Sequence, residues 1–521
     1  MDKDIGFATT TVPEYDDGLH EKPASSDEHD SGRPFEVAAS KTVFERYINR
    51  LVINNFGFTL QSGWEGVGLT FQFAWLNGGP AAIVYGAIIA GIGSTLVATA
   101  LGEMASMDPT VGAQYRWSAR FAGKAPEFWG FMQGWITVIA WICNCAAATS
   151  ISSNTLSGLI IFNNPSYEPK AWHATLFLIA LIIVPVLMNL ALRRVINYLE
   201  TLGGILHVIF FVAVVATLTT LAKRSTPEFV FKTLHTNSGW DNPGVAFSIG
   251  MLATAYPISS FDGVLHMIDE TKEPRKQVPR AMFFATSSNA IMQFAFCVCL
   301  MFCIGDEEAV SNSILPITEV FYSATGSKAA STIMTIMMAG ICMISNFNVV
   351  ASVSRLVWAF ARDKGLPFHQ YFAYIHPTLQ VPLPALMLVG TVCCLLSLIN
   401  LGSSAAFNAL IALPTIALYI SYLIPILLLT IRQLAGRHPK YGPWQLGRWS
   451  IPIKIAAIIY LTYVIVFVPF PSSRPVTNLT MNYAAPIFLG AIFLALGDWF
   501  IRGRRTFEVP TAALEWETED E

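Results

Sequence analysis

The runs Gly57-Phe-Thr-Leu-Gln-Ser-Gly-Trp-Glu-Gly-Val-Gly68 and Ala255-Tyr-Pro-Ile-Ser-Ser-Phe-Asp-Gly263 each interrupt an apolar stretch with residues that disfavour a continuous helix. The first combines closely spaced glycines with a glutamate, and the second combines a proline, two serines, an aspartate and a glycine. Glycine in an apolar helix often marks close packing rather than a break. Two interruptions that each carry an acid are instead typical of helices that break around a polar cavity, where other groups satisfy the freed backbone.

The composition places both runs in a membrane protein. Only 13% of the 521 residues are charged and 53% are hydrophobic, whereas about 25% are charged in a typical soluble protein. So few charges could not cover the surface of a soluble protein of this length, so we expect a lipid bilayer around it. The net charge of −3 provides no basic field for nucleic acid. The eight cysteines lie in apolar runs without metal-ligand spacing, and we expect neither a metal site nor a cofactor.

Apolar stretches of about 20 residues, the length that crosses a bilayer, recur along the chain. They predict an all-α polytopic membrane protein with about twelve transmembrane helices. The predicted spans are 51–76, 80–104, 127–160, 174–192, 199–221, 244–268, 281–304, 329–360, 384–401, 404–431, 453–470 and 483–501.

The interrupted spans, 1 and 6, are separated as in transporters built from two inverted repeats of five helices. Sequence identity between the halves is not evident, so this interpretation depends on the placement of the two runs. The predicted parts are a disordered cytosolic tail (1–50), two repeats (51–231 and 232–431), two extra helices (432–501) and a second cytosolic tail (502–521).

Lysine and arginine set the predicted orientation. They are concentrated in the segments 116–124, 193–194, 272–280, 362–364, 432–448 and 502–505, which share one side when both termini are cytosolic. Asn478, in the sequence Asn-Leu-Thr, then lies on the outer side as a predicted glycosylation site.

Several motifs outside the two runs carry a family resemblance. They lie in Gly78–Gly86, Gly102–Ser106, Pro109–Tyr115, Phe261–Met282, Ser354–Pro367, Gly442–Arg448 and Met481–Tyr483. Together they resemble the fungal amino acid/choline transporters of the amino acid–polyamine–organocation superfamily, and in particular its choline and 4-aminobutyrate permeases. The resemblance implies a twelve-span, inverted-repeat carrier that works by alternating access in the plasma membrane, with the vacuolar membrane as the alternative.

The residues at the two breaks form the predicted substrate-binding set. They are Gly63, Trp64, Glu65, Gly66, Tyr256, Ser259, Ser260, Phe261 and Asp262. Ionisable groups inside a bilayer are costly and are therefore functional candidates, and we expect the two acids to face each other across the cavity. The three aromatic rings either pack or form a cation–π wall, and the two serines are candidate hydrogen-bond donors to a substrate.

Glu65 departs from the pattern of the family that the chain resembles. Many members have a small residue here, in a break that accommodates a substrate carboxylate. A glutamate would repel a carboxylate and attract a cation, which favours amines or choline-like substrates. The alternative is a glutamate that is satisfied by backbone N–H groups, and for Asp262 the alternative is an acid that only orients its helix.

His207 is the candidate for proton coupling. The resemblance implies a lysine in span 5 of proton-coupled relatives, but this span contains His207 and no lysine. Histidine titrates near neutral pH, so a proton relay is one interpretation and a hydrogen-bonded core histidine is the other. Sodium coupling through Ser352 and Ser354 is the second possibility for the coupling ion.

Charged residues near the cytosolic face form a predicted inner gate, as the resemblance implies. Arg362 and the basic segment 272–280 would pair with Glu103 or with Asp269 and Glu270. The alternative is that the basic residues only set the orientation.

These features predict a secondary active transporter that imports a small nitrogenous solute (an amino acid, choline or another amine) together with protons. One alternative is an exporter of a nitrogenous or alkaloid secondary metabolite on the same fold. An alternative of another class is a non-transporting nutrient sensor. The sequence shows no nucleophile–base pair or nucleotide-binding loop, so we do not expect an enzyme.

Overall fold

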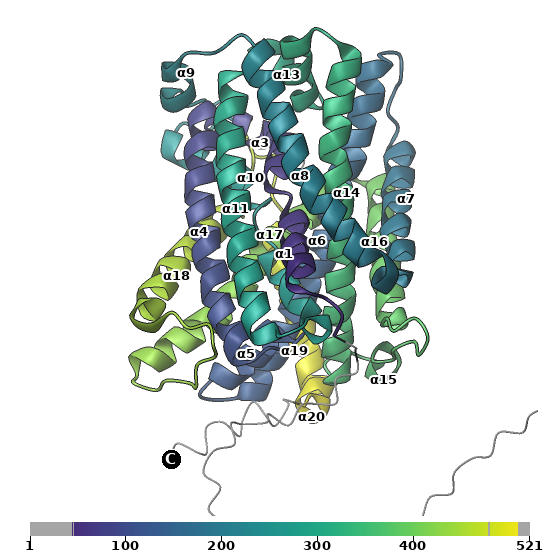
Figure 1. Cartoon of the computed structure of the whole chain (residues 1–521), viewed down its shortest axis with the longest axis vertical. Helices are drawn as coiled ribbons and strands as arrows, with labels where there is room; N and C mark the ends of the chain where they lie inside the picture. The colour runs from purple at the N-terminus through teal and green to yellow at the C-terminus, as the bar shows by residue number, and fades with distance from the viewer. Residues whose placement is uncertain (1–43, 45, 478–479, 509–521) are drawn as a thin grey trace, which may run out of the picture. The chain divides into compact units, whose positions relative to one another are not determined.

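The two interrupted spans lie within a bundle of long helices (Figure 1). The computed structural model describes residues 44, 46–477 and 480–508. Asn478 and most of the predicted tail 1–50 lie outside the described residues. Within them, ten helices are long and apolar enough to cross a membrane, in agreement with the predicted polytopic membrane protein.

These helices coincide with ten of the predicted spans. They are α4 (Gly79–Met107), α6 (Pro126–Asn163), α7 (Ala171–Leu190), α8 (Leu192–Leu221), α11 (Pro274–Phe302), α14 (Lys328–Arg362), α16 (Leu383–Gly402), α17 (Ser404–Leu434), α18 (Ser450–Phe467) and α19 (Ala484–Asp498). The remaining predicted spans, 51–76 and 244–268, are the two interrupted ones.

Short helices lie between the long ones or extend them. They are α5 (Ala113–Phe121), α9 (Pro227–Lys232), α12 (Glu307–Asn312), α13 (Pro316–Thr325), α15 (His369–Phe372) and α20 (Arg504–Thr506), with single turns η2 (Gly447–Trp449) and η3 (Trp499–Gly503). Figure 1 shows α9 and α13 at one end of the bundle and α5, α15 and α20 at the other.

The first broken span consists of α1 (Arg50–Gln61), α2 (Gly63–Thr70) and α3 (Gln72–Leu76). α1 and α2 meet at Ser62, whose φ of 47° lies in the left-handed region that residues other than glycine rarely adopt. The Ser62 hydroxyl donates to the Thr59 carbonyl at 2.6 Å and so satisfies a carbonyl at the end of α1. The helical pattern resumes where the Gly66 amide donates to the Ser62 carbonyl at 2.7 Å.

The second broken span consists of α10 (Pro243–Ala255) and a 3₁₀ helix, η1 (Phe261–Glu270), joined by residues 256–260. Pro257 has no N–H to continue α10, and Ser260 adopts a φ of 63°. Gln61 of the first break donates its side-chain amide to the Ile258 carbonyl at 3.1 Å, so a side chain from one break satisfies backbone of the other. Both breaks occur in the two predicted spans, and the repeat boundaries stay predictions.

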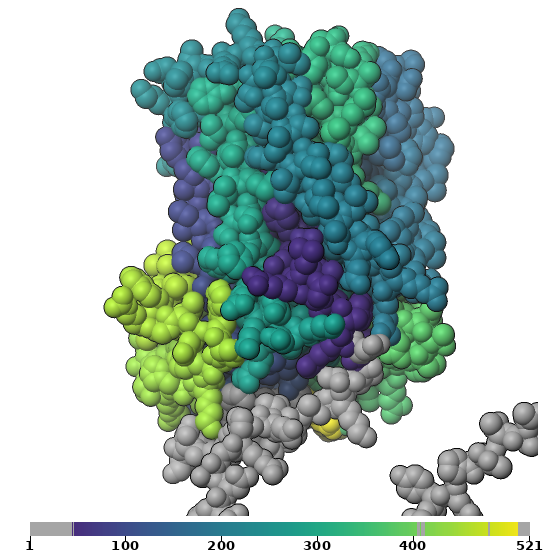
Figure 2. Space-filling view, in the orientation of Figure 1, coloured from purple at the N-terminus to yellow at the C-terminus, as the bar shows by residue number. Residues whose placement is uncertain are grey.

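The two halves of the first span have different surroundings. α1 packs against α11, α8 and α14, and part of its surface is visible between α8 and α11 (purple in Figure 2). Leu51 of α1 is 58% exposed, whereas Trp64 and Glu65 of α2 are fully buried. The half before the break therefore reaches the surface of the bundle, and protein encloses the half after it.

Candidate functional site

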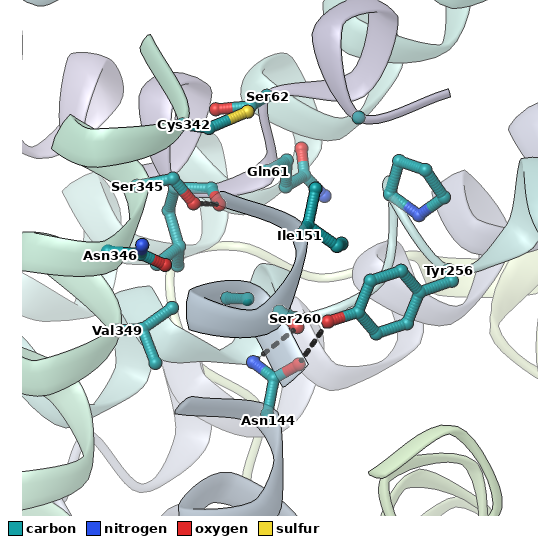
Figure 3. A pocket seen from close by; sticks show the side chains of 14 residues that line it. Gln61, Ser62, Asn144, Ile151, Tyr256, Ser260, Cys342, Ser345, Asn346 and Val349 are labelled. Atoms are coloured by element: carbon teal, nitrogen blue, oxygen red, sulfur yellow. Dashed lines mark hydrogen bonds between the residues drawn. The ribbon is translucent and has the colours of Figure 1, made fainter. Parts of the chain in front are cut away.

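A cavity of about 50 Å³ lies between the two breaks, α6 and α14. Its polar lining comes from four segments (Figure 3): Gln61, Ser62, Asn144, Tyr256, Ser260, Ser345 and Asn346. Since a water molecule needs roughly 10–15 Å³ of such space, the cavity has room for a few waters or a very small solute. None of the described side chains that line it carries a formal charge.

Asn144 of α6 connects the polar side chains of the second break. Its side-chain oxygen accepts from the Tyr256 hydroxyl at 3.3 Å, and its side-chain nitrogen donates to the Ser260 hydroxyl at 3.2 Å (Figure 3). On the opposite wall, the Ser345 hydroxyl donates to the Leu60 carbonyl near the end of α1 at 2.5 Å. Neutral hydrogen-bonding groups therefore position both breaks around the cavity.

Two helix ends of opposite polarity meet at this cavity. α2 begins at Gly63 without a side-chain cap from its N-cap residue, although the Gly63 amide donates to Asn289 Oδ1 at 3.0 Å. α10 ends at Ala255, next to the lining residue Tyr256. A helix N-terminus favours negative charge and a C-terminus favours positive charge. The two sides of the cavity therefore favour charges of opposite sign.

Three residues of the predicted binding set, Gly66, Tyr256 and Ser260, line the cavity, and Gly63 begins α2 beside it. The others point elsewhere in this structure. The Ser259 hydroxyl donates to the Tyr256 carbonyl at 2.6 Å.

Two of the predicted aromatic residues pack within the protein. The Trp64 ring lies edge-on to Phe296, with ring centroids 5.3 Å apart. The Phe261 ring packs on Tyr422, with ring centroids 4.9 Å apart. Of the predicted cation–π wall, only Tyr256 therefore lies at the cavity.

The two acids do not face each other, contrary to the expectation from sequence. Glu65 Oε1 lies 2.7 Å from His207 Nδ1 of α8, and both side chains are fully buried. Asp262 accepts hydrogen bonds from Gln114 at 2.6 Å, Trp141 at 2.9 Å and Tyr422 at 2.6 Å. Buried carboxylates turn toward available donors, and here those donors lie away from the cavity. Glu65 therefore gives no reason for the cavity to reject a carboxylate.

The remaining coupling candidates are bound to backbone. The Ser352 hydroxyl donates to the Gly263 carbonyl at 3.1 Å, which joins α14 to the second broken span. The Ser354 hydroxyl donates to the Ala351 carbonyl within α14 at 2.9 Å. The two serines therefore make separate contacts.

Three of the predicted gate residues lie together where the chain enters the bundle. Glu270 is paired with Arg355 at 3.0 Å and accepts from the Tyr47 hydroxyl at 2.6 Å. Asp269 lies 3.9 Å from Arg362. Burial raises the pKa of Asp269, and the Arg362 guanidinium opposes that rise.

Glu103 does not belong to this group, and its predicted pairing with Arg362 or the 272–280 segment is wrong. Its carboxylate is paired with the buried ammonium of Lys454 and accepts from the Ser450 hydroxyl at 2.7 Å. Both partners lie on α18, because α4 turns this face toward α18 rather than toward α14.

Sequence reasoning missed several polar residues of the core. Asn144 and Asn346 lie within apolar spans and line the cavity, so polarity at mid-span was an available signal. Glu200 and Lys454 are fully buried, but both lie at the edges of predicted spans, where charges normally reach the interface.

Comparisons with known proteins agree with this architecture. A model of the amino acid permease family matches residues 55–493. The chain is 29% identical to a choline transporter of Saccharomyces cerevisiae over 87% of this chain and 80% of that protein. It is 28% identical to amino-acid permease 2 of Neurospora crassa over 96% and 92%, respectively. It is 26% identical to a polyamine transporter of Saccharomyces cerevisiae over 95% and 82%.

These matches confirm the resemblance that the sequence motifs carry. The family model covers well over half of the chain. The chain therefore belongs to the amino acid permease family, and it is a multi-pass membrane transporter rather than an enzyme.

Proposed function

We propose that this protein imports a small zwitterionic amino acid together with protons by alternating access. The observation that carries the proposal is the uncharged cavity between two broken helices, where the N-terminus of α2 and the C-terminus of α10 meet. Relatives named as amino acid, choline and polyamine transporters support a small nitrogenous substrate.

The two helix ends suggest how a zwitterion would bind. The carboxylate would accept hydrogen bonds from amides at the start of α2, where the dipole favours negative charge. The ammonium would lie against the carbonyl end of α10 and the Tyr256 ring. A quaternary amine such as choline would use only this second half, and the described lining supplies no acid to balance its charge.

The ion pairs around Glu270 would form the inner gate. The Tyr47 and Ile48 amides donate to the Glu270 carbonyl at 3.0 Å each, so the segment before α1 is attached to the end of η1. Arg355 and Arg362 of α14 pair with the acids of η1. We infer from the distribution of lysine and arginine that this end is cytosolic, with both termini on the same side, and that the protein lies in the plasma membrane.

His207 and Glu65 would provide the coupling proton site. They are in direct contact, and His207 Nε2 and Glu65 Oε2 have no hydrogen-bond partner among the described residues. Glu65 lies on α2, beside the lining residue Gly66. A change of protonation would therefore alter how α2 is attached to α8.

Reconstituted vesicles test the proposal directly. Labelled alanine, 4-aminobutyrate, choline and putrescine are supplied under an imposed proton gradient, an imposed sodium gradient, or neither. The expected result is accumulation of one or both amino acids under the inward proton gradient alone. The proposal would be contradicted if choline but neither amino acid accumulated, or if the sodium gradient drove the accumulation. It would also be contradicted if the protein bound the probes without transporting any of them.

Asn144→Ala separates cavity binding from the gradient response. Loss of its two hydrogen bonds leaves polar groups at the cavity unpaired, at a cost of about 1–3 kcal/mol. We therefore expect uptake to reach half its maximum at a higher substrate concentration, with the response to the proton gradient unchanged. Asn164→Ala is the matched control, because Asn164 is exposed beyond the end of α6.

A further inference from the structure

The buried face of α8 carries a second ionisable group besides His207. α8 exposes much of its surface, but Glu200, Gly203, Gly204 and His207 are all buried on one side. Glu200 and His207 are seven residues apart, about 10 Å along a helix. His207 contacts Glu65 in α2, whereas Glu200 contacts Thr59 in α1. The two groups therefore lie on opposite sides of the break at Ser62.

Glu200 is held by neutral partners only. Its Oε2 lies 2.7 Å from the Thr59 hydroxyl, and that hydroxyl accepts from the Asn348 side-chain amide of α14 at 2.9 Å. Oε1 of Glu200 and Oδ1 of Asn348 are buried and have no hydrogen-bond partner among the described residues. The polar groups around the carboxyl therefore include acceptors without a donor and no described cation.

No described charge compensates this carboxyl. α8 packs against α1, α11, α14, α13 and α7, and in the described part of the chain none of them places a charged side chain in an ion pair with Glu200. On α8 itself, Arg193 lies near the start, stacked over Tyr47, and His207 is bound to Glu65. An ionised carboxylate without a cation is costly in such surroundings.

Thr59 can serve either protonation state of Glu200. Its hydroxyl also lies 2.9 Å from the Asn55 carbonyl of α1. When Glu200 is ionised, the hydroxyl donates to the carboxylate. When Glu200 is protonated, the carboxyl can donate to the hydroxyl, which then donates to Asn55 instead.

This hydrogen-bond chain ends at the cavity. The Thr59 carbonyl accepts from the Ser62 hydroxyl at 2.6 Å, and Ser62 lines the cavity at the break. Glu200 is thus joined through one residue to the point at which α1 ends, and α1 is also the half of the span that reaches the surface of the bundle.

We propose that Glu200 is a second proton-binding site of the transport cycle, which is protonated while α1 packs against α8 and loses its proton only after α1 has moved away. The proton can leave only when α1 moves enough for water to solvate the carboxylate, so proton release is tied to the opening of the cavity. This inference rests on the proposed proton-coupled function, and it assigns α1 and α2 to separate proton sites on α8.

Infrared spectroscopy of the purified full-length protein tests the protonation without any transport. We expect the wild type at neutral pH to show a neutral-carboxyl carbonyl band that disappears in Glu200→Gln and persists in the control Glu228→Gln, since Glu228 is exposed. Identical bands in the wild type and Glu200→Gln would show that Glu200 is ionised and would overturn the proposal. If Glu200→Gln does not fold, Thr59→Val provides the test instead, because it removes the hydroxyl that contacts the Glu200 carboxyl. The carboxyl band should then shift, and an unshifted band would overturn the proposal.

Vesicle transport tests the coupling with labelled alanine as the probe. Glutamine mimics the protonated carboxyl, so Glu200→Gln should exchange alanine at equal pH as the wild type does. One coupled proton can raise the ratio of internal to external alanine by up to about tenfold per unit of pH gradient. Glu200→Gln should lose this contribution to the accumulation of alanine. Wild-type accumulation by Glu200→Gln, or loss of its exchange in folded protein, would overturn the proposal. Absence of proton-driven uptake in the wild type would instead reject the proposed function, and the infrared result would still stand.

Discussion

Arg355 and Glu270 form the ion pair that we expect to hold the inner gate closed. Arg355 Nε lies 3.0 Å from Glu270 Oε1, and both side chains are almost fully buried. Removal of one partner of a buried pair costs about 3–5 kcal/mol, because the remaining charge is left unpaired. Arg355→Gln should therefore destabilise the closed gate by at least about 3 kcal/mol and raise the open population by roughly a hundredfold or more.

Native Cys342 reports on this change, because it lines the cavity. A membrane-impermeant thiol reagent applied from the side of the gate should label Cys342 much faster in Arg355→Gln than in the wild type. Cys342→Ser, introduced into the wild type and into Arg355→Gln, shows how much of the labelling belongs to Cys342, since the other cysteines remain. The matched control is Arg362→Gln, because Arg362 is 28% exposed, lies 3.9 Å from Asp269 of η1, and has its closer partner, Asp363, at the end of its own helix. Such a pair contributes about 0–1 kcal/mol, so labelling should change little.

Charge compensation provides the decisive comparison. Arg355→Gln combined with Glu270→Gln removes the unpaired charge as well as its partner, so labelling should fall back toward the wild-type rate. The reasoning is refuted if Arg355→Gln labels Cys342 no faster than the wild type. It is equally refuted if Arg362→Gln has the same effect as Arg355→Gln.

Two further predictions concern packing and coupling. In Gly263→Ala the added methyl would lie 2.4 Å from Leu60 Cδ2, so we expect about 1–3 kcal/mol of destabilisation from overpacking. Thermal unfolding in detergent measures this against Gly340→Ala, where nothing lies within 4 Å, and equal melting temperatures would contradict it. His207→Gln should lower the amino acid accumulation driven by an inward proton gradient to what the proton at Glu200 alone supports, whereas His438→Gln, at an exposed position, should accumulate as the wild type does. Accumulation at the wild-type level by His207→Gln would contradict the proposed proton site at His207 and Glu65.

The spans and the two breaks could be predicted from the sequence, because both depend on residues that are close together in the chain. About 20 apolar residues form a spanning helix wherever they occur. Likewise Ser62 beside Gly63, or Pro257 followed by Ser259 and Ser260, interrupts a helix through local backbone geometry. The tertiary structure adds only how each freed group is satisfied, as when Gln61 donates to the Ile258 carbonyl.

The partners of the charged groups were decided by tertiary structure alone. Glu65 meets His207 from 142 positions away, and Glu103 meets Lys454 from 351 positions away. Hydropathy predicts that such side chains face protein rather than lipid, but not which neighbouring helix presents the complementary group. That choice depends on how each helix is rotated about its axis, which the packing of the whole bundle fixes at once. The same rotation directs Glu65 to α8, so that the described residues lining the cavity include no acid.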